Sequence, residues 1–251
     1  MIRVNNILKK YSDKIILENI NLELPKNKIT AFIGSNGAGK STLISIISRT
    51  LAKDSGEVFI DEKELKNWNT TELSKRLSIL KQSNHLNIKL TVRELINFGR
   101  FPHSKGKLTK EDVKKVDEAI EYMDLSDLEN RYIDELSGGQ RQMAYIAMII
   151  AQDTDYIFLD EPLNNLDMKH SVQIMKILRN LIDEHGKTIM IVIHDINFVS
   201  CYSDYIVELK NGKIIKQGNT EDIIQSKVLN TIYGMDMCIH EIEQRKFCLY
   251  Y

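Results

Sequence analysis

A glycine-rich segment followed by lysine and serine constrains this 251-residue chain more than any other feature. Residues 34–41 read Gly-Ser-Asn-Gly-Ala-Gly-Lys-Ser, which fits the pattern GxxxxGK[ST] of a phosphate-binding loop. An apolar run at 28–34 precedes the loop, and an apolar stripe of helical spacing starts at Ser41. We therefore predict a strand, a loop and a helix, with backbone N–H groups and the positive end of the helix dipole facing a phosphate group.

The motif gives its side chains distinct tasks. Lys40 is expected to reach the β and γ oxygens of a bound nucleotide and to act in catalysis, and the Ser41 hydroxyl is expected to bind Mg²⁺. The glycines permit positive φ angles, which let the backbone close around a phosphate. The residues predicted to surround the nucleotide phosphates are Gly34, Ser35, Asn36, Gly37, Ala38, Gly39, Lys40, Ser41 and Thr42.

A second apolar segment ends in two carboxylates. Tyr156-Ile-Phe-Leu is followed directly by Asp160 and Glu161. A strand of this kind delivers its carboxylates at the carboxyl end of a parallel sheet, where α/β proteins bind ligands. We expect Asp160 to hold Mg²⁺ and Glu161 to polarise the water that attacks a phosphate.

Hydrophobic patterning indicates an α/β fold with a helical insertion. Residues 1–24 alternate in polarity and predict antiparallel strands, whereas 156–160 and 188–193 are continuous apolar runs typical of buried parallel strands. Asn211-Gly212 between two short apolar runs predicts a type I′ hairpin. We expect the tail from 219 to form short helices; the sequence leaves undecided whether a final pair of strands follows them.

The stretch from about 86 to 151 carries only helical signals. Thr91 with Glu94 forms a capping-box pattern, Thr109 opens a charged helix that ends near Met123, and an apolar helix is expected over 140–151. We predict no strand in this region.

Composition excludes several classes of protein. Lys plus Arg total 34 and Asp plus Glu total 35, so a strongly basic nucleic-acid binder is not expected. No stretch approaches the roughly 18 apolar residues of a membrane span, and no signal-peptide core is present, so an intracellular protein is expected. The three cysteines have no CxxC spacing and give no support for a zinc site or a disulfide framework.

Leu136-Ser-Gly-Gly-Gln140 opens the apolar helix just upstream of Asp160. Together with the phosphate-binding loop and the strand ending in Asp160-Glu161, it resembles the signature of the ABC-type ATPases, over almost the whole chain. The resemblance implies ATP and Mg²⁺ as cofactors. It also implies that a second copy of the chain presents its signature to the γ-phosphate through Ser137, Gly138, Gly139 and Gln140.

The resemblance also implies the fold and its divisions. We expect a P-loop NTPase (RecA-like) core with an antiparallel β subdomain and an inserted all-helical subdomain, within one ABC ATPase domain over 1–251. The nucleotide-binding core would comprise 1–85 and 152–218, the helical signature subdomain 86–151, and a short C-terminal extension 219–251.

The same resemblance implies roles for several single residues. Gln82 matches the Q-loop glutamine that senses Mg²⁺ and links to the transporter, and His194 matches the switch histidine that contacts the γ-phosphate and orders the attacking water. Tyr11 resembles the aromatic residue that stacks on adenine. Asp167 fits the D-loop and is expected among the residues that bind the nucleotide, whereas Asn164-Asn165 depart from the usual Ser-Ala and receive no role.

One segment narrows the expected cargo. Residues 98–103 resemble the Gly-Arg-aromatic-Pro-His stretch of importers for ferric siderophores, haem and vitamin B12, and residues 160–170 and 194–198 resemble the ferric-siderophore branch. For Arg100 and His103 we expect only a contact with another subunit. The implied assembly is an ATP-dependent homodimer on integral membrane permease subunits at the cytoplasmic face of the membrane, supplied by an extracytoplasmic substrate-binding protein, with no nucleic acid.

Four alternatives stay open at this point, among them half of an exporter, although such chains commonly carry their own membrane spans. The first of the other three is the ATPase of a haem or vitamin B12 importer. The second is a soluble ABC ATPase of repair or translation; repair members carry long coiled coils, but Gln82 to Leu136 has no sustained heptad, and translation members usually fuse two cassettes. A P-loop kinase or GTPase would not need the signature, and no Asn-Lys-x-Asp guanine motif is present.

Overall fold

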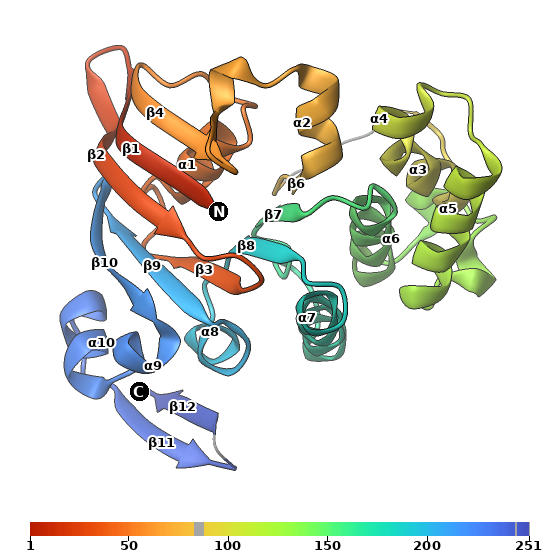
Figure 1. The fold of residues 1–251 in the computed structure, drawn as a ribbon. Coiled ribbons are helices and arrows are strands. Elements are labelled where there is room, and N and C mark those ends of the chain that lie inside the picture. Colours follow the sequence, from red (N-terminus) through yellow and green to blue (C-terminus); the bar gives the residue numbers. More distant parts are fainter. Residues whose placement is uncertain (83–87, 244, 251) are drawn as a thin grey trace.

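The computed structural model describes residues 1–82, 88–243 and 245–250. An antiparallel sheet of order β2-β1-β4-β5 occupies one side of the molecule (Figure 1). Its strands are β1 (Ile2–Tyr11), β2 (Lys14–Leu24), β4 (Ser55–Ile60) and β5 (Lys63–Glu64). The antiparallel pairing of β1 with β2 confirms the prediction for residues 1–24.

A second, mostly parallel sheet has the order β10-β9-β3-β8-β7-β6. Its strands are β3 (Ile29–Ile33), β6 (Leu77–Leu80), β7 (Tyr156–Asp160), β8 (Thr188–Val192), β9 (Tyr205–Lys210) and β10 (Lys213–Asn219). Every residue of β3, β7 and β8 is buried, as the apolar runs predicted. Asn211 and Gly212 have φ angles of 49° and 76°, which fit the predicted type I′ turn before the antiparallel β10.

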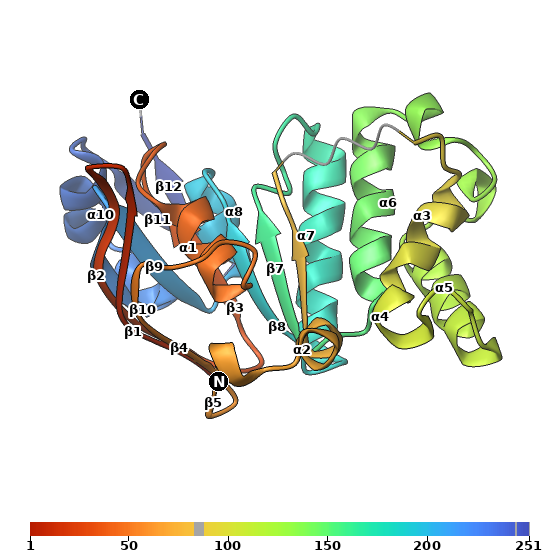
Figure 2. The same ribbon diagram turned by 90° about the horizontal axis from the view of Figure 1, so that it is seen from above.

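Side chains of the parallel strands alternate between two hydrophobic cores, because successive residues of a strand point to opposite faces. Phe158 joins α1 (Lys40–Ile47) and the antiparallel sheet on one face. Leu159 joins the helices of the other face, among them α6 (Gly138–Ala151) and α7 (Met168–Asp183). Figure 2 shows α1 beside β1 and β2, with α6 and α7 on the opposite side.

The predicted helical region forms a layer at the far side of α6 (Figure 2). Its other helices are α3 (Val92–Gly99), α4 (Phe101–Ser104) and α5 (Lys110–Tyr122), with 3₁₀ turns η2 (Ser126–Leu128) and η3 (Ile133–Glu135). Thr91 and Thr109 both form capping boxes at the predicted helix starts. The described residues 88–151 contain one isolated β-bridge, between Thr91 and Tyr132, and no β-strand.

The remaining elements are short. They comprise η1 (Leu65–Asn67), α2 (Thr70–Arg76), α8 (Ile196–Tyr202), α9 (Thr220–Ile223), α10 (Ser226–Tyr233), β11 (Cys238–Ile242) and β12 (Arg245–Leu249). The tail thus forms short helices and a final strand pair. The expected boundary at 85/86 and the last residue, 251, lie outside the described residues. Among the described helices, none combines the length and apolarity needed to cross a membrane.

Arg100 is a structural residue of the helical layer. Its side chain is 6% exposed, and its Nε donates a hydrogen bond to Asp112 Oδ1 at 2.8 Å. Its Nη1 donates to the carbonyl oxygen of Ala151, also at 2.8 Å, so it joins the starts of α4 and α5 to the end of α6. The expectation that Arg100 contacts another subunit is therefore wrong. His103 is half-buried and hydrogen-bonds the carbonyl oxygen of Gln152 through Nε2.

Replacing Arg100 by alanine should lower the free energy of unfolding by about 3–5 kcal/mol, because it leaves the Asp112 carboxylate buried without its partner. Hydrogen bonds from Thr109 and Arg100 lower the pKa of Asp112 from 3.8 to about 2. The loss should therefore be full above pH 3.8 and shrink as the pH falls towards 2. Urea titrations of Lys114→Ala, which removes an exposed ion pair, supply the control. Equal effects of both substitutions would contradict a buried Arg100–Asp112 pair.

Candidate functional site

The phosphate-binding loop is wedged between two strands. Gly34 has φ 134°, and a Cβ there would lie 2.0 Å from the carbonyl oxygen of Leu209 on β9. Gly39 has φ 104°, and a Cβ there would lie 2.6 Å from a methyl group of Leu17 on β2. A larger side chain at Gly34 or Gly39 would collide with these strands. The two glycines therefore allow the loop that precedes α1 to pack closely between β2 and β9.

Lys40 points back across this loop. Its side-chain Nζ donates hydrogen bonds to the carbonyl oxygens of Gly34 at 2.8 Å and Ser35 at 3.0 Å. Burial lowers the pKa of Lys40, and the charges of Glu161 and Asp160 oppose that shift. The two loop carbonyl oxygens therefore hold the ammonium group within the phosphate-binding loop.

Ser41 and Asp160 form a partly buried oxygen pair. The Ser41 hydroxyl donates a hydrogen bond to Asp160 Oδ1 at 2.9 Å, joining the first turn of α1 to the end of β7. Burial raises the pKa of Asp160, and the hydrogen bond from Ser41 lowers it. A hydroxyl and a carboxylate side by side form part of an oxygen donor set for a hard cation.

Glu161 is the centre of a hydrogen-bond network at the sheet edge. Its Oε1 lies 2.7 Å from His194 Nε2, and its Oε2 accepts a hydrogen bond from Gln82 Nε2 at 2.7 Å. The three residues follow β7, β8 and β6, so neighbouring parallel strands bring them together. Glu161 also has φ 52°, a left-handed conformation that is uncommon for a residue with a Cβ and recurs at functional sites.

Asn164 completes this network, although the sequence assigned it no role. Its Nδ2 donates a hydrogen bond to Glu161 Oε2, and its backbone N–H donates to the carbonyl oxygen of Glu161 at 3.3 Å. The signal in the sequence was an amide three residues after the carboxylate, in the turn that follows β7. Glu161 therefore accepts hydrogen bonds from amides on two sides.

The signature residues lie apart from this cluster. Ser137 N-caps α6: its hydroxyl accepts from the Gln140 N–H at 3.2 Å, and Gln140 Oε1 accepts from the Ser137 N–H at 3.1 Å. Ser137 and Gly138 are exposed, and Gly139 is half-buried. Within the described ranges, no hydrogen bond or ion pair joins residues 137–140 to the phosphate-binding loop. Within one chain, the phosphate-binding loop and the carboxylates therefore lie together, and the signature lies apart from them at the start of α6.

The other predicted residues occupy varied positions. Tyr11 ends β1, is 51% exposed, and has Lys9 Nζ 5.4 Å from its ring centroid. Asp167 N-caps α7 by accepting a hydrogen bond from the N–H of His170. Asn36 and Gly37 are exposed at the tip of the loop, Ala38 is buried, and Thr42 is half-buried in α1.

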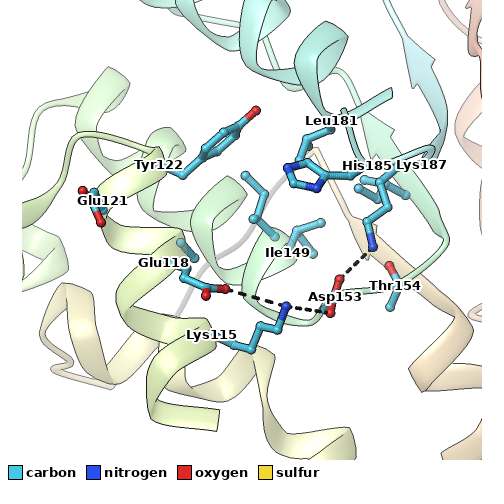
Figure 3. Close-up of a pocket in the computed structure, with 13 residues that line it drawn as sticks. Lys115, Glu118, Glu121, Tyr122, Ile149, Asp153, Thr154, Leu181, His185 and Lys187 are labelled. Atoms are coloured by element: carbon cyan, nitrogen blue, oxygen red, sulfur yellow. Dashed lines mark hydrogen bonds and ion pairs between the residues drawn. The ribbon is translucent and has the colours of Figure 1, made fainter. Parts of the chain in front are cut away.

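Two cavities differ in their relation to the site. One of about 480 Å³ adjoins the phosphate-binding loop and is lined by Ser35, Asn36, His194, Glu208 and Tyr233, among others. Another, of about 550 Å³, lies between α5, the end of α6 and the end of α7, and Figure 3 shows it. No predicted site residue lines this second cavity.

The loop, the carboxylate pair and the separate signature helix define a class: the ATP-binding cassettes among the P-loop ATPases. Residues 17–164 match the family model described as ABC transporter, and the chain belongs to that family. A solved dimeric bacterial ABC transporter cassette is 30% identical with a TM-score of 0.79, over 88% of this chain and 99% of that one.

Named relatives cover most or all of the chain. The petrobactin import ATP-binding protein YclP of Bacillus subtilis (strain 168) is 57% identical over all of both chains. The ferric enterobactin transport ATP-binding protein FepC of Escherichia coli (strain K12) is 36% identical over 90% of this chain and 84% of that one. Together with the family match, these similarities identify the chain as an ABC ATPase.

Lys40→Ala should weaken ATP binding at least about tenfold, because it removes the one cation inside the loop, and hydrogen bonds between charged groups are strong. Titration with a fluorescent ATP analogue measures the affinity. Lys114→Ala, far from the loop on α5, serves as the matched lysine control and should bind like the parent. Unchanged affinity of Lys40→Ala would count against the assigned loop.

Proposed function

We propose that this chain is the ATP-binding and ATP-hydrolysing subunit that energises import of ferric-siderophore complexes. The observation that carries the proposal is the 57% identity, over the full length, to a petrobactin import ATP-binding protein. A second petrobactin import protein, FatE of Bacillus anthracis, is 48% identical over 93% of this chain. None of the described site residues needs to touch the cargo, so the substrate class rests on these relatives.

The geometry supports a hydrolytic role for Glu161. The water oxygen attacks the γ-phosphorus, the bond from that phosphorus to the β–γ bridging oxygen breaks, and the water proton passes to the carboxylate. Gln82 and Asn164 hold Oε2, while His194 lies at Oε1. This arrangement fixes the carboxylate at the end of β7, and Lys40 adds positive charge where the leaving phosphate becomes more negative.

The oxygen pair at the loop fits Mg²⁺. Ser41 Oγ and Asp160 Oδ1 are hard oxygen donors 2.9 Å apart, and Gln82 brings an amide group to the neighbouring Glu161. When bound there, Mg²⁺ supplies charge neutralisation for the β and γ phosphates. The roles of Ser41, Asp160 and Gln82 are to hold the ion and keep it beside the loop.

A complete site would use two chains. Residues 137–140 are presented at the exposed start of α6, where N–H groups and the helix dipole favour an anion. A dimeric cassette among the solved structures supports a homodimer. In that homodimer each signature would meet the γ-phosphate bound to the partner chain. Tyr11 would stack on adenine. The 86–151 helices would contact the permease subunits at the cytoplasmic face, and an extracytoplasmic protein would deliver the cargo.

The proposed function is tested by uptake in cells that lack the gene. The parent chain should restore uptake of radioactive iron bound to petrobactin. In a separate assay of the purified protein, Glu161→Gln should lower the rate of ATP hydrolysis by at least about a hundredfold while ATP still binds. Glu184→Gln, an exposed carboxylate at the end of α7, is the matched control. Rescue of haem or vitamin B12 uptake alone would overturn the cargo, and normal turnover of Glu161→Gln would overturn its role as the base.

Two inactive variants should complement each other if each site is built from two chains. Lys40→Ala breaks the loop side and Ser137→Arg breaks the signature side, so each homodimer has two defective sites. A mixed dimer collects both defects in one site and leaves the other intact. The ATPase rate per mixed dimer should return towards half the normal value. If one intact site cannot turn over alone, Glu161→Gln versions should still trap one ATP per mixed dimer. Absence of both results would show that the site lies within one chain.

A further inference from the structure

His170 joins two parts of the proposed two-chain site within a single chain. It lies in the first turn of α7, three residues after Asp167. The His170 N–H donates to Asp167 Oδ1 at 2.8 Å, and its ring Nδ1 lies 2.8 and 2.9 Å from the two carboxylate oxygens. These hydrogen bonds hold the pKa of Asp167 below its ordinary value. The carboxylate therefore accepts from Nδ1–H and fixes the orientation of the ring.

The fixed ring packs on the signature turn. A Cβ added to Gly139 would lie 2.8 Å from Cγ and Nδ1 of His170 and 2.9 Å from its Cδ2. A Cβ added to the neighbouring Gly138 would meet no atom within 4 Å. The imidazole thus lies directly against the backbone of Gly139, whereas Gly138 faces open space.

We propose that His170 is a positioning residue that holds the signature turn, residues 137–140, at a fixed distance from the loop 164–167. Asp167 orients the imidazole, and the imidazole supports the start of α6. The signature turn is therefore presented to the partner chain in a position set by α7. This inference rests on the two-chain site proposed above, where the signature closes on the partner's γ-phosphate.

The surroundings of His170 distinguish positioning from a role in the core. Its side chain is 26% exposed and Asp167 is 63% exposed, so neither belongs to the buried core that holds the chain folded. Among the described residues, no hydrogen bond or ion pair joins His170 to Lys40, Ser41 or Glu161, so removing its ring should leave the loop and carboxylates of its own chain intact. Displacing the signature nevertheless weakens its contact with a phosphate, because hydrogen bonds from N–H and O–H groups weaken steeply away from their preferred distance and angle.

The first experiment separates dimer closure from nucleotide binding. In the Glu161→Gln background, His170→Ala should raise the dissociation constant of the ATP-bound dimer at least about tenfold in sedimentation experiments. The affinity of the dilute monomer for a fluorescent ATP analogue should stay unchanged. His170→Phe keeps a ring but loses Nδ1–H, and it should also weaken the dimer because Asp167 no longer orients the ring. His185→Ala, just beyond the other end of α7, is the matched control and should dimerise like its parent.

A second experiment tests the ring contact without nucleotide. Gly139→Ala should lower the melting temperature of the otherwise unchanged chain, because the new methyl group meets the imidazole. In the His170→Ala background the same change should be neutral or stabilising, since alanine favours a helix over glycine. An identical effect of Gly139→Ala in both backgrounds would show that the ring does not support the signature turn.

The outcomes distinguish this inference from the proposed function. If the Glu161→Gln parent forms no ATP-dependent dimer, the two-chain site fails. If the parent dimerises and His170→Ala dimerises equally well, the positioning role fails and the two-chain site stands. If His170→Ala loses monomer nucleotide affinity as well, His170 acts through the fold of its own chain, and the positioning role is overturned.

Discussion

Parallel strands buried on both faces place the phosphate-binding loop and the cluster of side chains around Glu161. The carboxyl ends of β3, β6, β7 and β8 lie at one edge of the same sheet. The phosphate-binding loop follows β3, and Gln82, Glu161 and His194 follow the other three. The order of the strands therefore brings together residues as far apart in the chain as Gly34 and His194, which line one cavity. Burial of these strands in two cores then makes the edge rigid enough to hold a carboxylate within hydrogen-bond distance of its partners.

Burial also sets the electrostatics of the site. It lowers the pKa of Lys40 and raises that of Asp160, so each group is held away from its preferred ionisation by the same loss of water. The charges of Glu161 and Asp160 oppose the shift of Lys40, and the hydrogen bond from Ser41 opposes the shift of Asp160. A cation, a carboxylate and a hydroxyl are thus held close together in a poorly solvated place, where a highly charged ligand interacts strongly with each of them.

The sequence predicted those parts of the fold that depend on local chemistry. Thr91 and Thr109 start helices because a capping box needs only residues three positions apart, and Asn211-Gly212 forms its turn for a similar reason. The motif residues were found because phosphate binding demands glycines and a lysine at fixed spacing. The burial of Arg100 was not predicted, because its partner Asp112 and the Ala151 carbonyl belong to other helices. The contact of His170 with Gly139 likewise depends on how distant segments pack, which no local pattern encodes. Asn164 was missed although it lies only three residues after Glu161, because residues 164–165 depart from the Ser-Ala that is usual in the family.

The strand order has a consequence for how the chain is made. β3 ends at Ile33, but its neighbours are β8, which starts at Thr188, and β9, which starts at Tyr205. During synthesis from the amino end, the strand that carries the phosphate-binding loop remains without either neighbour until most of the chain has emerged. Contacts of such large sequence separation form slowly, because the intervening loop must first be closed. The nascent chain therefore becomes able to bind nucleotide only near the end of translation. A chain truncated before β9 leaves β3 with an unpaired apolar edge and is expected to misfold, so it does not form a folded, inactive ATPase.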